Sequence, residues 1–225
     1  MSKKLVIFDL DGTLINSVAD LGNACNHALA AMGFPTHPKG VYNNMVGNGI
    51  SKLIERSLPE EARRQRVIEA MKVKFMEYYD EHLWEETEPY AGITELLDEL
   101  ASMGVKLAVA SNKYQAATKA LVEHFFGFLP WASVRGQEEM VPLKPDPSIV
   151  FNILTDSPTP KADVLYVGDS GVDIETAYRA CVENVAVTWG FRSHSELIAK
   201  HPDHIVNEPY EILRIVNGDI AGEDS

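Results

Sequence analysis

The sequence LVIFDLDGTL, residues 5–14, decides the fold. It begins with an uninterrupted apolar run, Leu5–Phe8, which is typical of a strand buried on both faces of a parallel sheet. Asp9 and Asp11 follow two residues apart, so an extended backbone directs both side chains to the same side. Gly12 allows the chain to turn and to approach a ligand closely. The pattern fits two structures: a turn that closes a strand, or a metal or phosphate site at the strand end.

Composition limits the classes of function. The chain has 225 residues, 45% of them hydrophobic, which is enough for one large domain or two modest ones with a proper core. Its formal net charge of −13 argues against nucleic acid as a partner, because a phosphate-backbone binder needs a clustered basic surface. No apolar run is long enough to span a membrane, and the first strand starts too early for a signal peptide. We therefore expect a cytoplasmic protein without a membrane partner.

The two cysteines, Cys25 and Cys181, lie far apart and have no metal-like spacing. Both fall within helical patterns. We expect them to be small buried apolar residues in a reducing compartment.

A helical segment interrupts the chain after the first strand. Apolar residues from Val18 to Met32 recur at helical spacing, with Ser17 as the expected N-cap. Helical patterning continues from Val41 to about Glu86, with no strand-like run. We predict that residues 16–87 form an inserted helical cap domain.

From residue 88 onward, strand and helix patterns alternate, which predicts a Rossmann-like, doubly wound parallel sheet of the α/β class. Residues 1–15 and 88–225 would form this catalytic core. The expected strands are Val105–Ala110, Ala132–Val134, Val164–Val167, Val185–Thr188 and His204–Val206. The expected helices are Ile93–Met103, Gln115–Phe126, one opened by Lys144–Pro147, Ile174–Ala180, Ser195–Ala199 and Tyr210–Val216. The acidic tail from Gly218 to Ser225 is expected to fray.

Polar residues follow three of these strands. Ser111, Asn112 and Lys113 come after one strand, Asp169 and Ser170 come after another with Asp173 close behind, and Lys144 stands at a helix start. Taken singly, Asp169 and Ser170 could be a helix cap and Lys144 a solvated lysine. Parallel strands, however, end at one edge of a sheet, where ligands bind in such folds. The convergence of all these groups with Asp9 and Asp11 predicts an active site.

The residue types point to phosphoryl chemistry. Asp9, Asp169 and Asp173 would provide the hard oxygen ligands that suit Mg²⁺. One carboxylate can attack phosphorus, and Asp11, packed beside the other carboxylates, can serve as the acid and base. Ser111 and Lys144 can bind the phosphoryl oxygens and offset their charge.

These motifs resemble those of the haloacid dehalogenase superfamily, phosphatase branch. The resemblance rests on DLDGTL at residues 9–14, SNK at 111–113, KPDP at 144–147 and GDSGVD at 168–173, in matching order and spacing. Within that superfamily, the segments 46–58 and 187–191 are similar to phosphoglycolate phosphatases. Two positions depart from the pattern: Asn16 stands where Asp is frequent, and Cys181 stands where a helix usually ends in Gly.

The resemblance implies roles for individual residues. Asp9 would be the nucleophile, Asp11 the acid and base, and Ser111 and Lys144 phosphate-site groups. Mg²⁺ would be held by Asp9, Asp169 and the backbone carbonyl of Asp11, with Asp173 and Ser170 as supporting groups. The expected substrate contacts come from Gly12, Thr13, Gly47, Asn48, Asn112 and Lys113. Arg56, also in the cap, is expected to face solvent.

The substrate is expected to be a small phosphorylated metabolite, with 2-phosphoglycolate as the leading candidate. Alternatives within the superfamily are a pyrophosphatase, a nucleotidase, or a mutase that resembles β-phosphoglucomutase. An alternative of another class is a phospho-acceptor signalling module, which also uses strand-end carboxylates, a lysine and Mg²⁺. The sequence leaves open whether the protein is a monomer or a homodimer.

Overall fold

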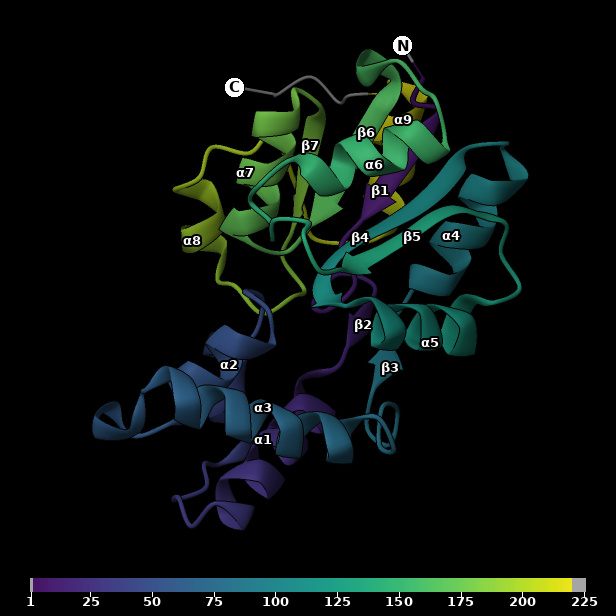
Figure 1. The fold of residues 1–225 in the computed structure, drawn as a ribbon. Coiled ribbons are helices and arrows are strands. Elements are labelled where there is room, and N and C mark those ends of the chain that lie inside the picture. The colour runs from purple at the N-terminus through teal and green to yellow at the C-terminus, as the bar shows by residue number, and fades with distance from the viewer. Residues whose placement is uncertain (1, 220–225) are drawn as a thin grey trace.

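The computed structural model describes residues 2–219 and divides into a sheet layered between helices and a separate group of helices (Figure 1). Within these residues, six strands form one parallel sheet in the order β5-β4-β1-β6-β7-β8. Their bounds are β1 Leu5–Phe8, β4 Lys106–Tyr114, β5 Trp131–Gln137, β6 Val164–Gly168, β7 Glu183–Val187 and β8 His204–Val206. The helices around the sheet are α4 Ile93–Ser102, α5 Gln115–Phe126, α6 Ser148–Asp156, α7 Gly171–Ala180, α8 His194–Ile198 and α9 Tyr210–Asn217.

The central strand β1 is buried on both faces, as its unbroken apolar run predicts. Val6 and Phe8 belong to the larger core cluster, which includes apolar residues of α4, α5 and α9. Leu5 and Ile7 belong to the opposite cluster with residues of α6 and α7. Helices therefore cover both faces of the sheet, and the predicted doubly wound α/β fold is confirmed.

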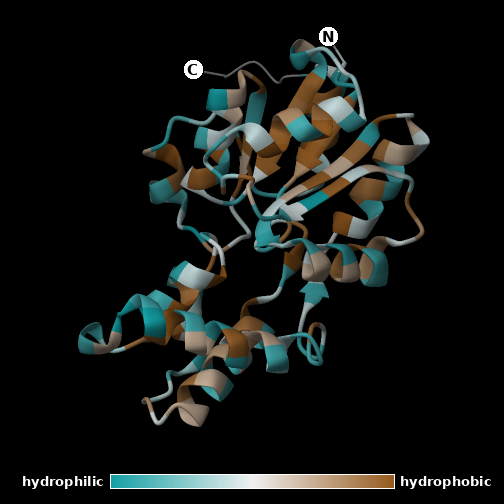
Figure 2. Cartoon of the chain, in the orientation of Figure 1, coloured by the Kyte–Doolittle hydropathy of each residue, from teal (hydrophilic) through white to brown (hydrophobic). Residues whose placement is uncertain are grey.

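The inserted segment is helical, as predicted. It consists of α1 Val18–Ala31, α2 Ile50–Ser57 and α3 Gln65–Tyr79, with short 3-10 turns at Lys39–Asn44 and Glu60–Ala62. In Figure 1 these helices lie together below the sheet, beyond its lower edge. Figure 2 shows the strands of the sheet mostly brown, whereas the helices of the insert mix teal, tan and brown turns. The apolar residues Leu29, Ile54 and Phe75 of these helices are buried.

Two short strands that the sequence did not predict connect the helical insert to the core. β2 Ile15–Asn16 pairs antiparallel with β3 Glu88–Pro89, at the two ends of the insert. Each strand has two residues, which is too short for an alternating pattern to be recognised.

Other differences are local. β4 continues past its predicted end through residues 111–113, and its pairing with β5 shifts register between Ala110 and Tyr114. Ser17 precedes α1 as predicted, but it makes no side-chain cap, because its hydroxyl donates to Asp11 instead. Of the tail predicted to fray, residues 220–225 lie outside the described residues. Within the described part of the chain, we find no helix with the length and hydrophobicity needed to cross a membrane.

The prediction for the cysteines is half right. Cys25 is buried in the core, whereas Cys181 is exposed. Cys181 is the C-cap of α7 and adopts a left-handed conformation with φ of 56° and ψ of 47°. A helix end of this kind lies at the surface, so the thiol points away from the core.

Candidate active site

Lys144 joins two of the predicted carboxylates at the carboxyl edge of the sheet. Its Nζ lies 2.9 Å from Asp9 Oδ1 and 2.7 Å from Asp173 Oδ1, and it donates to the carbonyl of Ala110 at 2.8 Å. All three charged side chains are buried. The lysine is therefore a structural counter-charge and is not solvated.

Asp169 completes the group. Among the described residues, Asp9, Asp169 and Asp173 each offer a carboxylate oxygen within 4.8 Å of the others. The Asp169 carboxylate accepts a hydrogen bond from the backbone N–H of Phe191 at 2.7 Å. Gly12 has φ of +87°, and a Cβ there would lie 2.4 Å from Asp169 Oδ2. Glycine is thus required for the close approach of the first motif to Asp169.

The charges of this group favour a cation. Burial, and next the neighbouring Asp173, raise the pKa of Asp169 to about 7. Burial also raises the pKa of Asp9 well above its ordinary value, although Lys144 opposes the effect. Three carboxylates against one ammonium leave an excess of negative charge that a divalent cation with oxygen preference would neutralise. The donor set therefore fits Mg²⁺.

Asp11 lies in different surroundings. The sequence-based expectation that it packs among the other carboxylates is wrong, because its contacts are a cation and a hydroxyl. Asp11 Oδ2 lies 3.3 Å from Lys113 Nζ, and Oδ1 accepts a hydrogen bond from Ser17. Lys113 also donates to the hydroxyl of Tyr79 in α3 at 2.7 Å. Asp9 and Asp11 thus belong to two separate networks that share the strand end.

Asn112 and Ser111 use their side chains within the core. Asn112 accepts from the backbone N–H of Lys144 at 2.8 Å and donates to the carbonyl of Lys144 at 3.2 Å. The hydroxyl of Ser111 accepts from the N–H of Lys113 at 3.2 Å. Asn112 therefore ties the Lys144 segment to the end of β4, which places the ammonium between the carboxylates.

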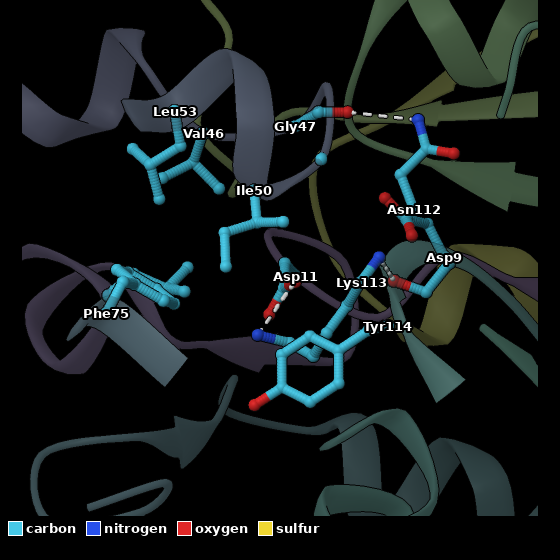
Figure 3. Close-up of a pocket in the computed structure, with 13 residues that line it drawn as sticks. Asp9, Asp11, Val46, Gly47, Ile50, Leu53, Phe75, Asn112, Lys113 and Tyr114 are labelled. Carbon is cyan, nitrogen blue, oxygen red and sulfur yellow. Dashed lines mark hydrogen bonds and ion pairs between the residues drawn. The ribbon is translucent and has the colours of Figure 1, made fainter. Parts of the chain in front are cut away.

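A cavity of about 40 Å³ lies between the strand ends and the helical insert (Figure 3). This volume corresponds to roughly three water molecules. We call two sets of core residues together the floor. The first set lines the cavity: Asp9, Asp11, Ser111, Asn112, Lys113 and Tyr114. The second set is the buried group beside Asp9: Lys144, Asp169 and Asp173. We call the residues from the insert the roof: Leu21, Val46, Gly47, Gly49, Ile50, Leu53 and Phe75. In Figure 3, Ile50, Leu53 and Phe75 face the polar floor across the cavity.

The chain resembles known proteins along nearly its whole length. A family model described as haloacid dehalogenase-like hydrolase matches residues 6–187. The chain belongs to the haloacid dehalogenase-like hydrolase family. It is 34% identical to a phosphoglycolate phosphatase of Pseudomonas syringae pv. tomato over 96% of this chain and 79% of that protein. It is 32% identical to a phosphoglycolate phosphatase of Mannheimia succiniciproducens over 95% of this chain and 98% of that protein.

A solved structure shows the same fold. A protein from Haemophilus somnus, described as a predicted phosphoglycolate phosphatase, superposes with a TM-score of 0.87 at 29% identity. The match covers 95% of this chain and 97% of that one. Membership of the haloacid dehalogenase-like hydrolase family agrees with the resemblance found in the four motifs.

Several of the remaining predicted residues lie beside the cavity instead of lining it. Asn48 is one residue from the roof, but its side chain accepts a hydrogen bond from Arg56 at 2.8 Å. Ser170 is the N-cap of α7 and forms a capping box with Asp173. Thr13 is fully buried, and its hydroxyl oxygen, like Asn16 Oδ1, has no hydrogen-bond partner among the described residues.

Two arginines of this hydrolase were misjudged or missed. Arg56 was expected to face solvent, but it is half-buried and also donates to the carbonyl of Met45 at 2.7 Å. Arg192 was not selected, although it follows directly on the 187–191 segment that carries part of the resemblance. Both side chains bind backbone carbonyls near the roof. Such contacts depend on how a loop folds and leave no residue pattern in the sequence.

Proposed function

We propose that this haloacid dehalogenase-like hydrolase is a Mg²⁺-dependent phosphatase of small phosphomonoesters, with 2-phosphoglycolate as its leading substrate. The observation that carries the proposal is the buried group of Asp9, Asp169, Asp173 and Lys144, of which Asp9 lines a small cavity under the insert. The relatives named phosphoglycolate phosphatase, about a third identical over nearly the whole chain, support this substrate.

In the proposed reaction, Asp9 is the nucleophile. One of its carboxylate oxygens attacks phosphorus and forms an aspartyl-phosphate, while the bond from phosphorus to the ester oxygen breaks. Asp11 gives its proton to the departing alkoxide, which leaves as an alcohol. Asp11 then takes a proton from water, and the resulting hydroxide attacks phosphorus and releases inorganic phosphate. The two aspartates have different partners, Lys144 for Asp9 and Lys113 for Asp11, so the two roles fall to separate networks.

The other floor residues would bind the phosphoryl group and neutralise its negative charge. Lys144 would offset the charge of the phosphoryl oxygens, and Ser111 would donate a hydrogen bond to one of them. Asp9, Asp169 and the carbonyl of Asp11 would hold Mg²⁺, which would add positive charge beside the phosphoryl group. Asp173 supports this arrangement through its contact with Lys144. These groups recognise features that all phosphomonoesters share.

Selection among substrates would fall to the insert. We propose that residues 16–87 are a cap domain that closes over the substrate, excludes bulk water and limits the size of the leaving group. The cavity of about 40 Å³ fits a leaving group of very few atoms. Lys113 would provide a positive charge for a carboxylate on that group, as phosphoglycolate requires.

The test is a phosphate-release assay with and without Mg²⁺ across phosphoglycolate, sugar phosphates, nucleotides and pyrophosphate. We expect Mg²⁺-dependent release, with the highest kcat/KM for phosphoglycolate. If phosphoglycolate is among the poorer substrates, the substrate assignment fails and the phosphatase assignment survives. If an isomerised sugar phosphate accumulates with little free phosphate, the protein is a mutase. A stable phospho-aspartate without turnover would favour the signalling alternative.

A further inference from the structure

The segment that follows β7, Trp189–Arg192, contacts both the floor and the insert. At its start, the indole Nε1 of Trp189 donates to the carbonyl of Thr13 at 3.0 Å. Two residues on, the backbone N–H of Phe191 binds the carboxylate of Asp169 at 2.7 Å. The segment is therefore fixed to the first motif and to the carboxylate group at the same time.

Gly190 makes this attachment tight. A Cβ at this position would lie 2.3 Å from Asp169 Cβ and 2.4 Å from the carbonyl oxygen of Gly12. Distances this short leave no room for a side chain, so the backbone itself packs against the site. Arg192, two residues after Gly190, therefore extends from a backbone that is fixed beside the floor.

Arg192 extends from this base to the insert. Its Nη1 donates to the carbonyl of Asn43 at 2.8 Å, and its Nη2 donates to the carbonyl of Val46 at 2.5 Å. Both acceptors belong to residues 43–49, which we call the roof loop and which contain three of the residues that line the cavity. A guanidinium group can bind two carbonyls in one plane, which fixes the orientation of a loop as well as its position.

Other contacts of the roof loop are weaker or local. The amide of Asn112 reaches the carbonyl of Gly47 at 3.5 Å, the limit of a hydrogen bond. Arg56 binds Met45 and Asn48, but it lies on α2 and therefore moves with the insert. Arg192 thus provides the short, paired hydrogen bonds that connect the core to the roof loop.

Arg56 and Arg192 both place a positive charge beside the roof loop. Both side chains donate their hydrogen bonds to neutral oxygens. Carboxylates lie near each arginine: Glu55 near Arg56, and Glu196 and Asp169 near Arg192. Burial, and then the nearby charge of Arg192, lower the pKa of Arg56. Two like charges are held near one loop, a cost that the hydrogen bonds to the loop must offset.

We propose that Arg192 is a positioning residue that holds the roof loop over the floor, so that Val46, Gly47 and Gly49 keep their places around the leaving group. The effect on catalysis rests on the proposed phosphatase function. The contact between Arg192 and the roof loop does not depend on that function. Arg192 acts through the loop and does not touch the carboxylates itself. Because the same segment binds Asp169, the roof loop and the proposed metal site are held by one short piece of chain.

The activity test compares Arg192→Ala, Arg192→Lys and a control, Arg179→Ala. Arg179 is an exposed residue of α7 that pairs with Glu175, so its removal deletes the same charge away from the roof loop. We expect Arg192→Ala to lower kcat/KM for phosphoglycolate by about 10–100-fold, because the loop around the leaving group would lose its position. Millimolar guanidinium chloride should restore part of this activity, and equal potassium chloride should not. The control should stay within about twofold of the unsubstituted protein.

Arg192→Lys separates charge from geometry. Lysine keeps the positive charge, but it cannot span both carbonyls with one planar group. We therefore expect its kcat/KM to remain well below that of the unsubstituted protein. Full activity in Arg192→Lys, or loss in Arg192→Ala that guanidinium does not restore, would overturn the proposal.

Hydrogen exchange of the amides of residues 41–50 gives a readout that needs no activity. Exchange should be faster in Arg192→Ala and unchanged in Arg179→Ala, with α4 and α5 equally protected in both variants. Unchanged exchange in the roof loop would overturn the proposal even if the protein is an active phosphatase. If the unsubstituted protein hydrolyses no phosphomonoester, the proposed function fails, and the exchange experiment still decides whether Arg192 holds the loop.

Discussion

The floor and the roof of the cavity are built in different ways. The floor consists of charged and amide side chains that the ends of parallel strands bring together, and Lys144, Asp9 and Asp173 are buried and paired. The roof is mainly apolar, and the Arg192 side chain connects its loop to the core by donating to two backbone carbonyls. Under the proposed function, the floor would bind the phosphoryl group that every phosphomonoester has in common, whereas the roof would contact the leaving group, which differs among substrates. Changes in the floor should therefore affect all substrates alike, and changes in the roof should alter their ratio.

Asp9→Asn should break the floor most severely. The substitution keeps the shape of the side chain but removes the proposed nucleophile, so kcat should fall at least about a thousandfold for every substrate. Phosphate release measures the loss, and circular dichroism checks that the fold persists. Asn16→Asp is the matched control. It exchanges the same two residue types in the reverse direction at a position that does not line the cavity, and it should remain active. Retained turnover in Asp9→Asn would remove Asp9 as the nucleophile.

Lys144→Met tests the floor as a structural unit. Methionine fills much of the space but leaves Asp9 and Asp173 without the ammonium they share. Removing one partner of a buried ion pair costs about 3–5 kcal/mol of unfolding free energy. Urea denaturation without added divalent cation would measure this loss. Lys119→Met, at an exposed position of α5, should change stability by less than about 0.5 kcal/mol. An equal, small effect of both substitutions would show that the carboxylates do not depend on Lys144.

Ile50→Ala tests the roof. Ile50 lines the cavity at the start of α2 and is half-buried, so its truncation should enlarge the cavity with little loss of stability. Removing a few methyl groups from an apolar pocket changes discrimination by about tenfold or more. We expect the ratio of kcat/KM for glycerol phosphate to that for phosphoglycolate to rise by this factor. Val73→Ala, at an exposed position of α3, should leave the ratio unchanged. A uniform loss for both substrates in Ile50→Ala would mean that the roof does not select.

The floor and the core around it could be predicted from the sequence, whereas the contacts of the roof loop could not. The core strands and helices could be predicted because long apolar runs and helical periodicity leave few alternatives, as at Leu5–Phe8 and Gln115–Phe126. The convergence of Asp9, Lys144 and Asp169 could be predicted because parallel strands end at one edge. These features depend on many residues that all favour one arrangement.

Features that depend on one or two contacts could not be predicted. The position of Asp11 beside Lys113 and Ser17 depends on the path of the chain after the strand. Asp9 and Asp11, which appear as a pair in the sequence, therefore separate into two networks. The binding of the roof loop by Arg192 joins residues more than 140 positions apart through backbone carbonyls, which any residue type provides. Nothing in the residue pattern distinguishes such an arginine from a solvated one.

Cys181→Gly should have the smallest effect and acts outside both floor and roof. Cys181 has φ of 56°, a conformation that costs a residue with a Cβ about 1–2 kcal/mol. Glycine removes this cost but loses more backbone entropy on folding, about 0.5–1 kcal/mol. The net gain should therefore be about 0.5–1 kcal/mol, measured by urea denaturation. Cys181→Ser, which keeps the Cβ and removes the thiol, is the control and should not gain stability. Equal stability of the two variants would show that backbone strain at this helix end is absent. A gain in stability without any change in kcat/KM would show that a change at the C-terminal end of α7 does not affect the active site, although Asp173 lies in the first turn of the same helix.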